Sequence, residues 1–143
     1  MLMTSTGPDV QLSTYSRQRS RLLLPGLAAA AVAAVAVTAV AALAMAVGVD
    51  FELPDGGESI PLAAFTQLTF TFSVVGILLA LAIRRWASHP ARIWARTAAA
   101  LTALSLVPPF LVGANLATEC TLVFAHLVAA AIVIPVVARR LAA

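Results

Sequence analysis

The chain has 143 residues, of which 62% are hydrophobic and 10% are charged. A single soluble core of this length cannot bury that much apolar surface, so the composition excludes an ordinary soluble domain and indicates a membrane protein. The net charge of +3 comes from nine arginines without a lysine, and these arginines lie only in the gaps between apolar runs. A nucleic-acid-binding protein would instead carry its basic residues along one soluble face, so we expect no nucleic-acid partner.

The first 20 residues are rich in Ser, Thr and Gln and show no apolar periodicity. We therefore expect a flexible cytoplasmic tail over residues 1–20, followed by one membrane domain over residues 21–143. The first span of this domain covers about residues 22–49, which exceeds the roughly 20 residues that a spanning helix needs. Gly26, Ala30 and Ala34 recur every four residues, a spacing that lets another helix backbone approach closely.

A cleaved secretory signal is the alternative for this first region. Arginines at positions 17, 19 and 21 precede the apolar run, and Ala44-Met45-Ala46 is similar to a cleavage site. The apolar part of a signal has roughly 7–15 residues, and this run is much longer. We therefore expect an uncleaved span.

The second predicted span, about residues 61–83, follows a loop that holds four of the six acidic residues. The acidic spacing in this loop differs from that of a calcium-binding EF-hand, so we expect a solvated loop. Within the span, Gln67 and Thr71 lie four residues apart and share a helix face. Gln67 is the least ordinary residue of the span, because a buried amide must find a hydrogen-bond partner.

The third predicted span covers about residues 93–112, with Thr102 and Ser105 on one face. Ser88 is the expected N-cap and Pro90 lies in the expected first turn. Pro108 and Pro109 lack backbone donors, so we expect the helix to kink or end there.

The fourth predicted span covers about residues 118–137 and contains His126, with Glu119 near its start. These two residues are about 20° apart around the helix and roughly 10 Å apart along its axis, so they share a face without touching. His126 has no second strong metal ligand at helical spacing, and Cys120 is the only cysteine. We therefore expect no metal and no other cofactor.

The arginines flank the first span, the connection between the second and third spans, and the end of the fourth. By the positive-inside rule, this distribution predicts an all-α, four-helix transmembrane bundle with both termini in the cytoplasm. The connection between the second and third spans should contact anionic lipid headgroups. The predicted lipid-interface residues are Arg84, Arg85, Trp86, Arg92, Trp94 and Arg96.

The less ordinary polar residues all fall in the outer half of this topology. If the second, third and fourth spans pack together, a candidate pocket opens outward, lined by Gln67, Thr71, Ser105, Glu119 and His126. An ionisable residue inside a membrane suggests function, such as a proton relay, a haem ligand or a lipid or quinone pocket. The structural alternative is a neutral His126 that is hydrogen-bonded to Gln67, to a threonine or to a carbonyl freed by Pro108 and Pro109.

Several elements together resemble a group of small four-helix membrane proteins of actinobacteria, classified as a domain of unknown function. They are the serine-glycine second span, His-Pro-Ala-Arg at 89–92, Leu-Ser-Leu-Val-Pro-Pro at 104–109 and the histidine of the fourth span. The resemblance covers roughly residues 61–141. It implies a four-helix membrane fold and an actinobacterial source, and therefore a multi-pass protein of a bacterial plasma membrane, and it implies no activity.

Three classes of function are compatible with these observations. The first is a non-enzymatic membrane subunit or scaffold, as a homo-oligomer or within a larger membrane complex. The second is a small transporter or ligand-binding protein that uses the outward pocket around His126. An enzyme acting on lipid or quinone is the weakest, because we find no nucleophile with a base and no paired carboxylates.

Overall fold

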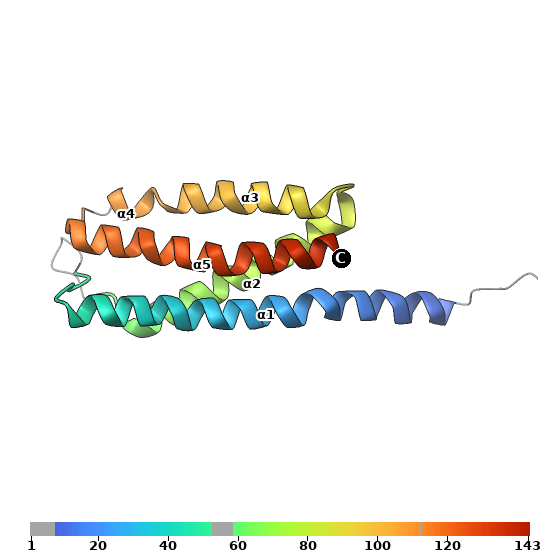
Figure 1. The fold of residues 1–143 in the computed structure, drawn as a ribbon, viewed down its shortest axis with the longest axis horizontal. Coiled ribbons are helices and arrows are strands. Elements are labelled where there is room, and N and C mark those ends of the chain that lie inside the picture. Colours follow the sequence, from blue (N-terminus) through green and yellow to red (C-terminus); the bar gives the residue numbers. More distant parts are fainter. Residues whose placement is uncertain (1–7, 53–58, 112) are drawn as a thin grey trace, which may run out of the picture.

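The structure, a computed structural model, describes residues 8–52, 59–111 and 113–143, and within these ranges every regular element is a helix. The side chains are described from Arg21 onward. The helices in chain order are α1 (Pro8–Ala46), α2 (Leu62–Trp86), α3 (Pro90–Ser105), α4 (Pro108–Leu111) and α5 (Leu116–Ala142) (Figure 1).

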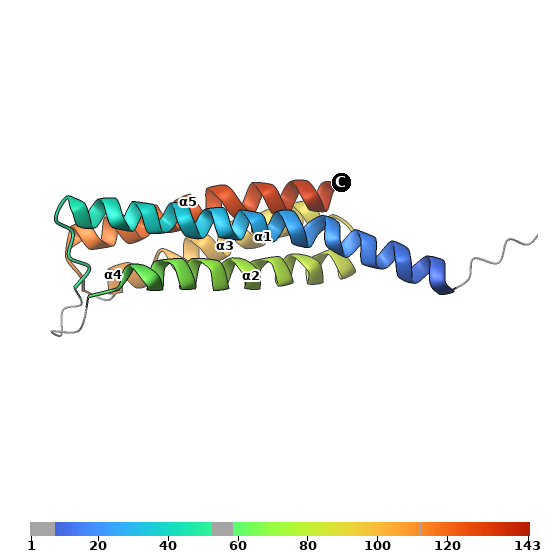
Figure 2. The same cartoon turned by 90° about the horizontal axis from the view of Figure 1, so that it is seen from below.

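The four longer helices form an elongated bundle in which α1 packs against both α2 and α5 (Figures 1 and 2). The α3 helix packs mainly along α5, and α2 and α5 share few contacts with each other. The first turns of α1 project beyond one end of the bundle (Figure 2). Around the bundle the helices therefore follow the order α1, α2, α3, α5, so that α2 and α5 lie diagonally opposite each other.

Three helices are long and apolar enough to cross a membrane, namely Arg21–Ala46, Leu62–Trp86 and Leu116–Ala142. They correspond to the first, second and fourth predicted spans. The predicted third span is instead divided, because α3 ends at Ser105 and the four-residue α4 begins at Pro108. At 1.5 Å per residue, α3 is about 24 Å long, which is shorter than the roughly 30 Å of a hydrocarbon core.

The interruption confirms the predicted effect of the two prolines. The N–H groups missing at Pro108 and Pro109 would have bonded the carbonyls of residues 104 and 105. Instead, Val107 donates to the carbonyl of Leu104 at 3.2 Å, which closes the end of α3 as a tight turn. At its start, α3 is capped by His89 without a side-chain bond, so the prediction that Ser88 caps it is wrong.

The α1 helix begins at Pro8, so residues 8–20 are helical where the sequence led us to expect a tail. Residues 9–20 contain no glycine or proline, and a helix already nucleated by a long apolar segment extends at little cost. Proline also fits the first turn of a helix, where its missing N–H is not needed.

The first core cluster joins all four longer helices in the half of the bundle that contains the end of α5. Gly26 of α1 faces Ile77 of α2 so closely that a Cβ at Gly26 would lie 3.2 Å from the Cδ1 and Cγ1 atoms of Ile77. The Ile77 side chain therefore fills the space beside Gly26, and the close approach of a second helix backbone along α1 stays a prediction. The cluster contains Leu22, Ala30, Ala33, Ile77, Ala80, Trp94, Ala98, Val133, Val137 and Leu141.

The second core cluster lies at the other end and includes Phe51, from the segment after α1. The Phe51 and Phe65 rings meet edge to face, with centroids 5.1 Å apart. Phe51 is fully buried although its φ of +52° is in the left-handed region. The Phe51 ring lies in the second core cluster together with Val37, Ala41, Phe65 and Ala125.

Polar bonds add two further links between the elements. The Thr38 and Thr66 hydroxyl groups lie 2.6 Å apart and join α1 to α2. The Asn115 side chain accepts from the Thr118 backbone N–H at 2.8 Å and donates to the Asp50 carboxylate at 2.9 Å. Asn115 therefore caps α5 and fastens the segment after α1 to it.

Candidate functional site

The structure does not bring Gln67 and Thr71 together with the other three residues predicted to line the pocket. Gln67 and Thr71 are exposed on α2. Gln67 follows the buried Phe65 by two residues, or about 200° around the helix, so it lies on the opposite face. Since Phe65 is in the same cluster as Ala125 of α5, the Gln67 face points away from α5.

His126 is half-buried on α5 and bonded within its own helix. Its Nδ1 atom lies 2.7 Å from the carbonyl oxygen of Leu122, one turn earlier. Because a carbonyl only accepts, Nδ1 carries the proton in this contact. The partner is thus a carbonyl of the same helix, and not Gln67, a threonine or a carbonyl freed by the two prolines.

The remaining polar residues are bonded in a similar way. Ser105 donates to the carbonyl of Thr102 at 2.7 Å, and Thr102 donates to the carbonyl of Ala98 at 2.8 Å. Glu119 lies in the first turn of α5, where a carboxylate favours the positive end of the helix dipole. The helices α2, α3 and α5 all contact one another, and it is the rotation of α2, with Gln67 and Thr71 on its exposed face, that keeps these two residues away from the rest of the predicted set.

A shallow apolar groove, open over most of its surface, lies elsewhere, between α3 and α5, and encloses about 500 Å³. It arises because alanines of both helices leave space between them. The sequence signal for this groove is the presence of alanine at positions 99 and 103 of one helix and at 130 and 131 of the other, which become neighbours only through the packing of the two helices. The groove is lined by Ala99, Thr102, Ala103, Leu106, Leu127, Ala130, Ala131, Ile134 and Pro135.

One end of this groove continues into arginines. Arg96 lies three residues before Ala99 and seven before Ala103, so it shares their face of α3, and Arg92 lies one turn further. On α5, Arg139 follows Pro135 by four residues and so shares its face. All three arginines are exposed.

The two tryptophans of the predicted lipid interface differ in their surroundings. Trp86 is 78% exposed at the end of α2. Trp94 is only 3% exposed, and its Nε1 donates to the carbonyl of Ile134 at 3.3 Å. The prediction of Trp94 as a lipid anchor is therefore wrong: the indole packs between α3 and α5, opposite the small Gly76 of α2.

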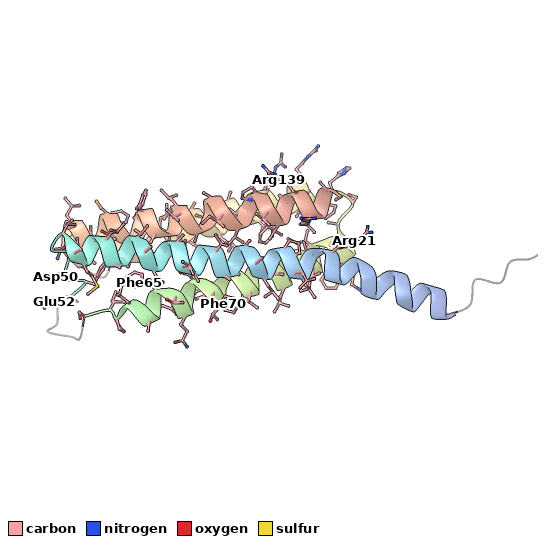
Figure 3. The ribbon with its side chains drawn as sticks, turned by 60° about the horizontal axis from the view of Figure 1, so that its bottom comes forward. Arg21, Asp50, Glu52, Phe65, Phe70 and Arg139 are labelled. Atoms are coloured by element: carbon pink, nitrogen blue, oxygen red, sulfur yellow. The ribbon has the colours of Figure 1, made fainter. Side chains whose placement is uncertain are left out.

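Charge is separated between the two ends of the bundle, as Figure 3 shows for Asp50 and Glu52 at one end and Arg21 and Arg139 at the other. The arginines of α2 and α3 lie at the same end as Arg139, because Arg84 and Arg85 are in the last turn of α2 and Arg92 is in the first turn of α3. This arrangement places the cationic end of the groove at the basic end of the whole molecule.

Comparison with known proteins gives one match. A model of a family of unknown function (DUF6069) matches residues 17–143. No curated protein and no solved structure matches the chain.

Proposed function

We propose that this chain, which belongs to the family of unknown function DUF6069, is a non-enzymatic membrane subunit that associates with a second copy through α2. The observation that carries this proposal is the exposure of α2. Of the 18 residues that form its most apolar stretch, 11% are buried, whereas the corresponding shares are 33% for α1 and 17% for α5. A membrane helix with so little of its surface packed is well placed to receive a neighbour.

The composition of the exposed α2 face supports a protein neighbour over lipid alone. Gln67 and Thr71 lie on it together with Phe70 and Phe72. An amide transferred into hydrocarbon without a partner costs several kcal/mol, whereas an interhelical hydrogen bond in a membrane contributes about 0.6–2 kcal/mol. Two Gln67 side chains can satisfy each other, since an amide both donates and accepts.

The topology within this proposal has four spans, with α3 and α4 together as the third. Both termini lie in the cytoplasm of a bacterial cell, and an actinobacterial source remains a prediction from the resemblance. The separation of arginines from carboxylates supports this orientation, because positively charged loops are retained on the cytoplasmic side.

Energy transfer between labelled copies of the full chain in liposomes tests the association. We expect transfer to fall as lipid is added, and Gln67→Leu to shift this dilution curve toward weaker association by about threefold to tenfold. Gln67→Asn, which keeps an amide, should retain more of the association. Transfer that is equal for the wild type, Gln67→Leu and a non-interacting membrane protein would contradict the proposal.

The transporter alternative has less support, because Gln67 and Thr71 of its expected pocket are exposed on a face of α2 that points away from α5.

A further inference from the structure

We infer that the groove between α3 and α5 binds an acyl chain of an anionic phospholipid, whose phosphate is held by Arg92, Arg96 and Arg139. This site goes beyond the proposed association through α2. It depends on the membrane location of the bundle but not on the Gln67 face.

The length of the groove fits one leaflet. On α3 its lining extends from Ala99 to Leu106, and on α5 from Leu127 to Pro135. These stretches are about 10 Å and 12 Å long at 1.5 Å per residue, and half of a hydrocarbon core is about 15 Å. An acyl chain that begins at the basic end of the bundle can therefore lie along most of the groove without reaching the other leaflet.

The lining fits a hydrocarbon chain and offers little to a polar ligand. Eight of its nine residues are apolar, and the ninth, Thr102, already donates its hydroxyl to the carbonyl of Ala98. Small ligands that bind tightly to polar sites need convergent donors and acceptors, which this lining does not supply. An acyl chain in contact with alanines and leucines needs no hydrogen-bond donor or acceptor.

The arginines supply the headgroup contact. Arg96 is about 4.5 Å along the axis from Ala99, and Arg139 is about 6 Å from Pro135, so two helices present guanidinium groups at the same end of the groove. A planar guanidinium can bond two phosphate oxygens at once. The apolar part of the groove thus matches the acyl chain of a phospholipid, and its cationic end matches the phosphate.

Charge complementarity favours this occupant. Arg92, Arg96 and Arg139 lie at one end of the groove, where three positive charges repel one another and the phosphate of an anionic lipid would neutralise them. The cytoplasmic leaflet, which faces the basic end in the proposed topology, is also the leaflet rich in anionic lipid.

Native mass spectrometry of the full-length, delipidated protein tests the site. The protein is titrated with phosphatidylglycerol, with phosphatidylcholine of the same chain length and with inorganic phosphate. We expect one phosphatidylglycerol to bind more tightly than phosphatidylcholine. Inorganic phosphate should bind far more weakly, because it lacks the chain that the groove receives.

Paired variants separate the groove from general electrostatics. Arg96→Gln should weaken phosphatidylglycerol binding about fivefold, while Arg85→Gln, which removes an exposed arginine of α2, should leave this site nearly unchanged. Ala103→Leu fills the groove and should reduce binding about tenfold or more, in contrast to Ala100→Leu, which is exposed outside the lining. Circular dichroism and thermal unfolding of each variant confirm that the fold is retained.

Three results would overturn the inference. They are equal losses for Arg96→Gln and Arg85→Gln, equal losses for Ala103→Leu and Ala100→Leu, and binding of phosphatidylcholine as tight as that of phosphatidylglycerol. Gln67→Leu is included in the same titration and should bind the lipid normally. Loss of self-association with retained lipid binding, or the reverse, therefore shows which of the two proposals has failed.

Discussion

Substituting Gly26 with leucine tests the closest contact between α1 and α2. A Cβ at this position would lie 3.2 Å from two atoms of Ile77, which is inside the optimal carbon–carbon separation of about 3.5–4.0 Å. Leucine adds three further carbons, so the two helices must separate or Ile77 must leave its rotamer. Overpacking of this kind costs about 1–3 kcal/mol. The upper limit is the loss of the Ile77 contacts, about 2–5 kcal/mol, since this side chain is 1% exposed.

Unfolding of the full chain in mixed micelles, followed by circular dichroism over a range of denaturing detergent, measures this cost. Ala28→Leu is the matched control, because Ala28 is exposed two residues along the same helix. Adding Ile77→Ala should recover part of the loss, since the shortened side chain makes room for the leucine. The reasoning is refuted if Gly26→Leu unfolds at the same midpoint as Ala28→Leu, or if the double variant shows the simple sum of both losses.

Three further predictions use the same unfolding measurement. Trp94→Phe should lower stability by about 0.6–1.5 kcal/mol through loss of the indole bond to α5, and an unchanged midpoint would contradict this role. Asn115→Ala should cost about 1 kcal/mol, because it removes the cap of α5 and the link to Asp50; Asp50→Ala, which keeps the cap, should cost less. His126→Leu should change stability by less than about 1 kcal/mol, because within the described part of the chain the ring bonds to Leu122 of its own helix. A loss of several kcal/mol would instead point to a partner on another helix.

The long helices could be predicted from the sequence because their limits are set by local chemistry. The α2 helix lies within a few residues of its predicted span, between Pro61 and the arginines that must stay near water. The break after Ser105 followed from the missing donors of two prolines. These features depend on neighbours within one or two turns, which a sequence displays directly.

The placement of Trp94 and Gln67 could not be predicted because it depends on which helices become neighbours. An indole close to an arginine-rich connection has the composition of a lipid anchor. Its buried site is created by other helices, which contribute the small Gly76 of α2 and the carbonyl of Ile134 among other contacts. An alanine-rich α1 has small residues around its whole circumference and so can pack against several partners. The packing of α2 leaves its Gln67 face exposed, and spacing along the sequence does not display how a helix is rotated against its neighbours.

The two proposed surfaces are compatible with each other because they involve different helices. Association through the Gln67 face covers α2, whereas the groove is formed by α3 and α5 and remains in contact with lipid. Gln67 also lies near the acidic end of the bundle, while the arginines of the groove lie at the basic end. A lipid held at the basic end would neutralise part of the repulsion between the arginines of two neighbouring copies, since exposed charges interact over about 10 Å at ordinary salt. Anionic lipid should therefore strengthen the self-association of the wild type more than that of Arg96→Gln, although neither surface touches the other.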